Sequence, residues 1–119
     1  MAARTFHVLL AIAAPLTACG GGSAAGPSDA QISAARKAVP AGAKVFALYC
    51  GSCHGEHGTA PMAPPVLGPS ALRRPELGTV AGLQQYLKRA MPPGKPGSLS
   101  DAQYRDVAEY MLRVQATKR

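Results

Sequence analysis

Cys50-Gly51-Ser52-Cys53-His54 places two thiols and an imidazole within five consecutive residues. On a helix, positions i, i+3 and i+4 share one face, so these three side chains point the same way. That arrangement suits one flat ligand. The spacing is the attachment pattern of c-type haem, in which the two thiols form thioether bonds with the porphyrin and the adjoining imidazole binds its iron.

Three other interpretations use the same residues. A disulfide between Cys50 and Cys53 would suit an exported protein, but it leaves His54 unexplained. A zinc site built from the two thiols, His54 and His57 would lack the usual separation between its two halves. A thioredoxin-like redox pair needs a βαβ context, and the sequence has no strand pattern. We therefore favour haem attachment over these alternatives.

The composition limits the chain to one small domain and excludes a multidomain enzyme. Its 119 residues include 13 Lys and Arg, 6 Asp and Glu, three Cys, no Trp and only two Phe. Short chains with so few bulky side chains commonly complete their core with a cofactor, a metal or disulfides. Because 23 Ala stand against nine Val and Ile, the composition favours an all-α fold.

The first 18 residues predict a secretory signal peptide. Arg4 precedes an apolar stretch, residues 6–16, that is too short to span a bilayer. Leu16-Thr17-Ala18-Cys19 resembles the bacterial lipobox, in which the cysteine becomes the lipid-modified first residue. An ordinary signal peptide that leaves Cys19 as a free thiol is the alternative. We expect export to the periplasmic side of a bacterial membrane, with a lipid anchor at Cys19.

Residues 19–28 predict a flexible linker rich in Gly and Ser between this anchor and a folded domain over residues 29–119. Such a stretch can bury nothing, and about eight residues give a reach of roughly 16 Å. Gly20 replaces the Asp that is associated with inner-membrane retention in some bacteria, which favours the outer membrane. Cleavage after residue 18 removes one basic residue, so the net charge falls from +7 to +6.

Two capping boxes predict where helices begin. Ser28-Asp29-Ala30-Gln31 and Ser100-Asp101-Ala102-Gln103 each place a hydroxyl three residues before an amide. The two side chains satisfy backbone N–H groups at a helix start. We therefore expect helices over residues 29–38 and 101–116, the second with its apolar residues on one core-facing side.

Proline and threonine mark two further helix starts. Pro40 favours the first turn of a separate helix that carries the cysteine motif. Thr79 is the expected cap of a helix over residues 80–89. Leu99 precedes the last helix and is expected to pack against Tyr104.

The region from Ala41 to Val114 resembles a small bacterial class I cytochrome c. Residues 42–50 are similar to the first helix of that family, with the aromatic Phe46 four positions before the first cysteine. The resemblance implies three to five helices around one covalently bound haem c, with the core over residues 41–114. It also implies that the first and last helices cross, which would bring Phe46 close to Tyr110.

His54 is the expected proximal iron ligand, and the distal ligand must come from elsewhere. His57 lies in the next loop and is expected to be a solvated residue. Met91 opens a proline-rich segment and matches the Met-Pro axial position of the family, so it is the expected distal ligand. Met62 is the second choice, whereas Met111 falls on the apolar face of the last helix and is expected in the core. An open or water-bound iron is the remaining possibility.

The second nitrogen of an axial histidine normally donates a hydrogen bond that fixes the ring. The resemblance implies that the carbonyl of Pro65 accepts this bond, with Pro64 as the alternative. Tyr86, on the helix that leads to Met91, is expected either in the core or over the cofactor.

Ligation by histidine and methionine leaves no free iron position for a substrate. The sequence therefore predicts a carrier of single electrons, not an enzyme, with no small-molecule substrate. Residues 96–110 resemble cytochromes that serve periplasmic oxidation of sulfur compounds or alcohols, so an electron-accepting subunit of a dehydrogenase complex is an alternative. A haem peroxidase or ligand sensor would need an open iron site.

The excess of positive charge points to redox partners with acidic docking surfaces. Five basic residues are expected around the exposed edge of the cofactor: Arg73, Arg74, Lys88, Arg89 and Lys95. Export makes nucleic acid an implausible partner, and the lipid anchor makes the membrane the other expected contact.

Overall fold

The computed structural model describes residues 26–60, 62–68 and 71–116. The predicted signal peptide, Cys19 and residues 20–25 of the linker lie outside the described residues. The described chain is all-helical and has no strand, which confirms the predicted fold class. Its elements are α1 (Asp29–Ala38), α2 (Pro40–Tyr49), α3 (Gly51–His54), the 3-10 turn η1 (Pro75–Gly78), α4 (Val80–Ala90) and α5 (Asp101–Ala116).

The helices begin at the predicted caps. The hydroxyl of Ser28 accepts the Gln31 N–H, and the Gln31 side chain accepts the Ser28 N–H in return. The same reciprocal pair opens α5, where Ser100 Oγ lies 3.1 Å from the Gln103 nitrogen. Thr79 Oγ1 accepts the N–H of the third residue of α4 at 3.1 Å. These local bonds satisfy backbone donors that the first helical turn leaves free.

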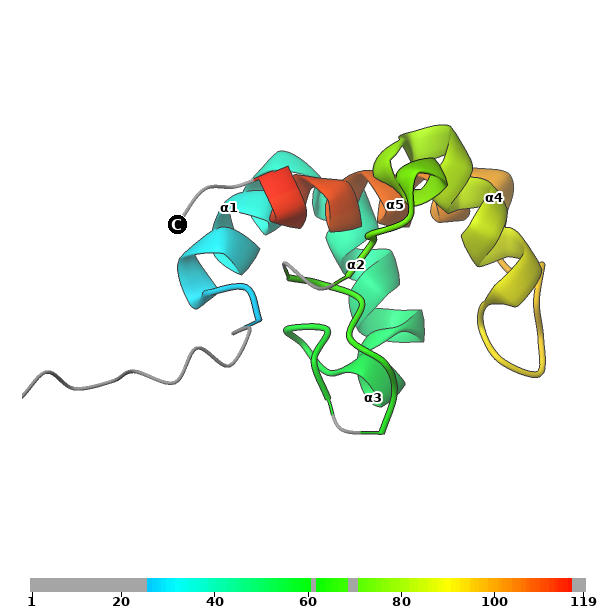
Figure 1. Ribbon diagram of the computed structural model, residues 1–119, viewed down its shortest axis with the longest axis horizontal. Helices are drawn as coiled ribbons and strands as arrows, with labels where there is room; N and C mark the ends of the chain where they lie inside the picture. Colours follow the sequence, from blue (N-terminus) through cyan, green and yellow to red (C-terminus); the bar gives the residue numbers. More distant parts are fainter. Residues whose placement is uncertain (1–25, 61, 69–70, 117–119) are drawn as a thin grey trace, which may run out of the picture.

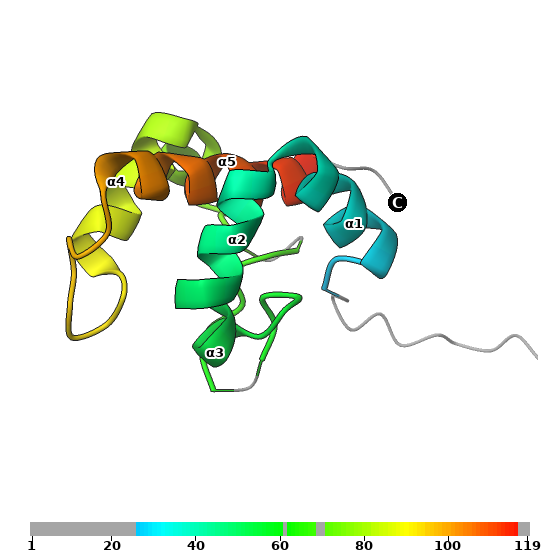
Figure 2. The same ribbon diagram turned by 180° about the vertical axis from the view of Figure 1, so that it is seen from behind.

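The helix α5 is the central element. Figures 1 and 2 show α1 packed near its C-terminal end and α4 near its N-terminal end, with α2 crossing between them and leading away to α3. The helices α2, α4 and α5 each contribute residues to the lining of one cavity. The cysteine motif lies at its border, at the junction of α2 and α3.

The crossing of α2 and α5 depends on a glycine. A Cβ atom at Gly42 would lie 2.0 Å from the carbonyl oxygen of Asp106 and 2.7 Å from Cβ of Tyr110, so only glycine permits this approach. One turn further, the rings of Phe46 and Tyr110 meet with their centroids 5.5 Å apart at 53°. The expected contact between the first and last helices of the cytochrome-like region is therefore present. Both rings are buried, together with Leu83 and Val107.

No helix within the described ranges has both the length and the apolar composition that crossing a membrane requires.

Candidate cofactor site

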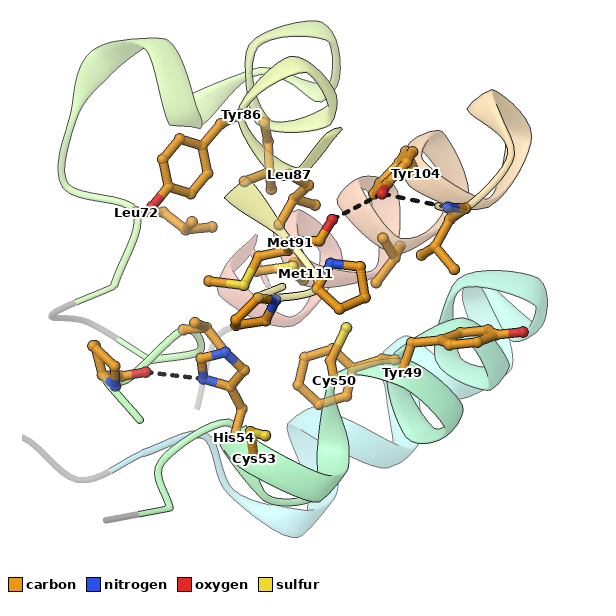
Figure 3. Close-up of a pocket in the computed structure, with 18 of the residues that line it drawn as sticks. Tyr49, Cys50, Cys53, His54, Leu72, Tyr86, Leu87, Met91, Tyr104 and Met111 are labelled. Atoms are coloured by element: carbon orange, nitrogen blue, oxygen red, sulfur yellow. Dashed lines mark hydrogen bonds between the residues drawn. The ribbon is translucent and has the colours of Figure 1, made fainter. Parts of the chain in front are cut away.

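A cavity of about 380 Å³ opens between α2 and α3 on one side and α4 and α5 on the other (Figure 3). Its volume lies within the range of about 300–1,000 Å³ that is typical of cofactor and ligand sites. Most of its lining is apolar or aromatic and comes from all four of these helices, including Phe46, Leu83 and Leu87. The thiols and the imidazole lie on the wall that carries the cysteine motif.

The motif residues meet at this wall as their spacing predicts. Cys50 ends α2, while Cys53 and His54 belong to α3, and all three line the cavity. The two cysteines are free thiols rather than a disulfide. Burial in the apolar wall and then the proximity of Cys53 raise the pKa of the Cys50 thiol to about 11. The thiol therefore stays neutral, as an apolar wall requires.

The imidazole of His54 is held in one orientation. Its side chain is buried, with the residue only 7 % exposed, and its Nδ1 lies 3.1 Å from the carbonyl oxygen of Pro64. Because a carbonyl oxygen can only accept, Nδ1 is the donor of this bond, and in the neutral imidazole Nε2 then has the lone pair that a metal requires. Pro65 was expected to be this acceptor, and that prediction is wrong. The acceptor is Pro64, the alternative named from the sequence, and both prolines line the cavity.

The three candidate methionines lie in different environments. Met91 is half-buried and lines the cavity at the end of α4 (Figure 3). Met62 is 84 % exposed and is not part of the cavity wall. Met111 also lines the cavity, but it is 3 % exposed and belongs to the core cluster on α5. Met91 and Met111 therefore lie at the cavity and Met62 does not, and of the expected ligand Met91 and the second choice Met62, Met91 is the one at the cavity.

The hydroxyl of Tyr104, which the sequence did not single out, contacts Met91. The phenol of Tyr104 donates a hydrogen bond of 2.8 Å to the Met91 carbonyl oxygen and lies 3.4 Å from the Leu99 nitrogen (Figure 3). Tyr104 and Leu99 were expected to pack together, and both line the cavity. A buried tyrosine hydroxyl usually finds a hydrogen-bond partner, so the sequence held a signal that some partner exists. It could not tell which partner.

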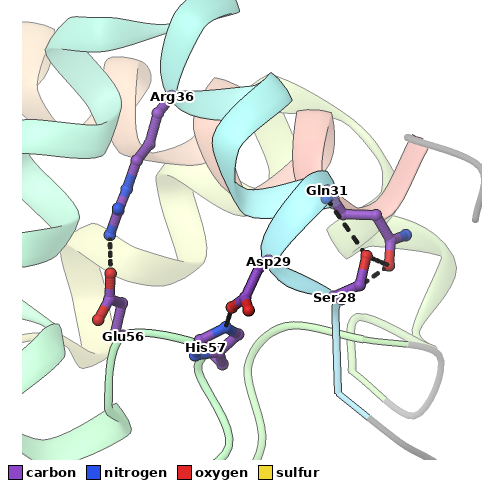
Figure 4. A network of polar contacts seen from close by, with 6 residues as sticks. All are labelled: Ser28, Asp29, Gln31, Arg36, Glu56 and His57. Atoms are coloured by element: carbon purple, nitrogen blue, oxygen red, sulfur yellow. Dashed lines mark hydrogen bonds and ion pairs between the residues drawn. The ribbon is translucent and has the colours of Figure 1, made fainter.

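His57 is placed away from the cavity lining. Its Nε2 lies 2.7 Å from a carboxylate oxygen of Asp29, and Arg36 pairs with Glu56 beside it (Figure 4). His57 is therefore a half-exposed loop residue that ties the chain after His54 to α1. Among the described residues, no group of three His, Cys, Asp or Glu side chains is arranged to hold a metal ion, so the geometry does not support the zinc interpretation.

The five basic residues expected near the cofactor are all exposed. Arg74 lies 3.5 Å from Glu76 and also stacks over the ring of Tyr86, 4.9 Å from its centroid. Lys88 pairs with Asp101 at 2.6 Å, and this hydrogen bond raises the pKa of Lys88. The other three, Arg73, Arg89 and Lys95, form no ion pair within the described parts of the chain.

An all-helical fold around an apolar cavity, with two thiols and a fixed imidazole on one wall, defines a c-type cytochrome. Residues 37–111 match the family described as cytochrome C oxidase, cbb3-type, subunit III. Because the match spans more than half of the chain, the protein belongs to this family. No curated protein and no solved structure matches the chain.

Membership of this family identifies haem c, bound covalently, as the cofactor, and electron transfer between redox proteins as the function. The residues fit that group. The thiols of Cys50 and Cys53 are uncommitted, Nε2 of His54 is free, and the remaining walls are apolar.

Proposed function

We propose that this protein is a periplasmic carrier of single electrons in which His54 and Met91 are the two axial ligands, and that it converts no substrate at the iron. The position of Met91 carries the proposal. Its thioether borders the same cavity as His54, whereas Met62 lies on the surface. Met111 has a mid-helix place in the core, so its side chain has less freedom to act as a ligand.

Each residue of the site has a distinct task. Cys50 and Cys53 hold the cofactor covalently, and haem supplies one-electron chemistry when bound. The carbonyl oxygen of Pro64 accepts a hydrogen bond from Nδ1 of His54. This hydrogen bond fixes the imidazole ring and raises the electron density at Nε2. Met91 supplies a thioether, a ligand that raises the reduction potential of haem iron. The apolar walls limit the access of water, and a small change in polarity around the iron shifts the potential further.

An optical spectrum of the ferric holoprotein tests the ligand assignment. Wild-type protein should show the weak sulfur-to-iron band in the far red, and Met91→Ala should lose it. The matched control Met62→Ala should retain the band because Met62 lies outside the cavity. Loss of the band in the Met62→Ala protein, or its persistence in Met91→Ala, would overturn the assignment.

The same proteins test the interpretation as a peroxidase or ligand sensor. An iron with two strong protein ligands should not bind added carbon monoxide in its ferrous form, whereas ferrous Met91→Ala should bind it. Rapid carbon monoxide binding by the wild-type protein would indicate an open iron site and favour a sensor or an enzyme.

A stable subunit of a larger redox complex is the second candidate function. The family description names an oxidase subunit, and residues 96–110 resemble cytochromes that serve periplasmic oxidations. Native electrophoresis of solubilised membranes with haem staining separates the two functions. A freely exchanging carrier should migrate at its own small mass, while a subunit should comigrate with an oxidase or a dehydrogenase.

Positive charge supports an acidic partner. Arg73, Arg89 and Lys95 are exposed and form no ion pair within the described chain. Arg73 precedes η1, Arg89 lies in the last turn of α4, and Lys95 lies within the segment that joins α4 to α5. The rate of electron exchange with an acidic redox protein should fall as ionic strength rises, because salt screens exposed charges. A rate that is insensitive to salt, or that rises with it, would contradict this docking mode.

The chain before the described residues supports export and anchoring at Cys19. Haem from wild-type cells should sediment with membranes, and outer-membrane fractions should contain it if Gly20 permits sorting there. Cys19→Ala, expressed with an ordinary signal peptide, should release the same haem protein into the soluble periplasmic fraction. Soluble wild-type protein would refute lipidation.

A further inference from the structure

We infer that Tyr104 is a positioning residue that holds Met91 at the iron-binding wall of the cavity through its phenol oxygen. The inference rests on the proposed ligation by Met91. Tyr104 lies on α5, thirteen positions after Met91, and is not itself proposed as an iron ligand. Its evidence is a hydrogen bond to the main chain of the ligand residue.

One oxygen atom closes the Met91 segment, defined here as residues 91–99. The Tyr104 hydroxyl donates to the Met91 carbonyl at 2.8 Å and accepts the Leu99 N–H at 3.4 Å, so it ties the first and last residues of the segment (Figure 3). Tyr104 is 1 % exposed, and water therefore cannot easily replace this oxygen. The phenol is both donor and acceptor, which no apolar side chain of the same shape can be.

The rest of the Met91 segment does not fix Met91. Pro92 and Pro93 follow it and have no N–H to donate. The two backbone hydrogen bonds inside the segment join Lys95 to Pro92 and Ser98 to Lys95, so they shape the turn without reaching Met91.

The backbone of Met91 is hydrogen-bonded on both sides of its Cα, through its N–H and through its carbonyl oxygen. Its N–H bonds to the Leu87 carbonyl at 2.8 Å, which fixes it to α4. Its carbonyl bonds to Tyr104, which fixes it to α5. The residue has extended backbone angles, φ −133° and ψ 148°, so it has left the helix and depends on the second bond for its direction. Both bonds together define where the thioether begins.

Tyr104→Phe tests this role because it keeps the ring and removes only the hydroxyl. The Met91 carbonyl and the Leu99 N–H then lose a partner in a buried wall. Because the hydrogen bonds of the Tyr104 hydroxyl are lost, more of the ferric protein should lack the far-red band. At a given urea concentration this fraction should be about tenfold higher than in the wild type. The band should therefore disappear before the helices unfold, as followed by circular dichroism, and the reduction potential should fall.

Tyr110→Phe is the matched control. Tyr110 lies on the same helix, is equally buried at 1 % exposure and also loses a hydroxyl, but that hydroxyl interacts with Arg36 and not with the Met91 segment. In this variant the band and the helical signal should disappear together at the same urea concentration. If both variants behave alike, Tyr104 has only a structural role and the inference is overturned.

Two further measurements keep the outcomes separate. If Met91→Ala keeps the band, the proposed ligation fails, whereas a normal band in Tyr104→Phe beside a lost band in Met91→Ala overturns only the positioning role. If Tyr104→Phe does not fold, hydrogen exchange on the wild-type holoprotein decides. The Leu99 amide should lose its protection at the same urea concentration as the band, and protection that outlasts the band would contradict the inference.

Discussion

Gly42→Ala is expected to destabilise the protein, although alanine is the better helix former. Alanine in a helix interior is favoured over glycine by about 0.8–1 kcal/mol. Against this gain, the new Cβ would lie 2.0 Å from the Asp106 carbonyl oxygen and 2.7 Å from Cβ of Tyr110. The oxygen is a backbone atom of α5 and the Cβ position is fixed by the backbone, so no side-chain rotation can relieve the overlap. The two helices must move apart by more than an ångström.

Two costs of this movement can be estimated. Overpacking in a well-packed interior costs about 1–3 kcal/mol. Separation of the helices also loosens the contact between Phe46 and Tyr110, a type of pair worth about 0.5–1.5 kcal/mol. After subtraction of the helix-propensity gain, the net loss is roughly 0.5–3.7 kcal/mol. For a domain of this size, each 1 kcal/mol lowers Tm by about 4–8 °C.

Thermal and urea unfolding of the ferric holoprotein, followed by circular dichroism, measures this loss. Gly78→Ala is the control, because a Cβ atom at Gly78 would meet nothing within 4 Å. It should leave Tm almost unchanged. A Gly42→Ala protein as stable as wild type would show that the helices accommodate a methyl group at their crossing, and would refute the close-contact reasoning.

Four further predictions concern a helix cap, a buried leucine, an exposed ion pair and a buried tyrosine. Thr79→Ala should cost about 1 kcal/mol in urea unfolding because α4 loses its cap. Leu83→Ala should cost about 2–5 kcal/mol by the same assay, since this buried side chain lines the cavity. A double-mutant cycle with Arg36→Gln and Glu56→Gln should give a coupling of only about 0.2–1 kcal/mol, because both side chains are exposed. Burial raises the pKa of Tyr110, so stability should fall as the pH rises above about 10, and Tyr110→Phe should flatten that fall in unfolding experiments at different pH.

Sequence reasoning was most successful where a feature depends on neighbouring residues. The starts of α1 and α5 follow from capping boxes that close within four residues, and both helices have their predicted bounds. The cysteine motif likewise contains its own geometry, because a helical turn is enough to bring its three side chains to one wall. The helix over residues 80–89 extends one residue further than predicted, to Ala90.

The details that failed or were missed depend on the path of irregular chain. Pro64 and Pro65 are chemically identical acceptors, and only the course of the loop decides which carbonyl faces His54. The bond from Tyr104 to Met91 joins two elements across a turn whose shape no local pattern defines. The pairing of His57 with Asp29 spans 28 residues, so neither residue could indicate the other in the sequence.

The packing of α1 shows which interactions hold this helix against the rest of the domain. Most of α1 precedes residues 37–111, the part that matches the family, yet α1 packs on α5 and pairs with the loop after His54. The Arg36–Glu56 ion pair and the hydrogen bond between His57 and Asp29 are both exposed, and exposed contacts of this kind contribute about 0–1 kcal/mol each. Ile32 is almost completely buried, and burial of an isoleucine contributes about 1.5–3 kcal/mol. Apolar packing therefore holds α1 in place more strongly than its exposed polar contacts with the loop that follows His54.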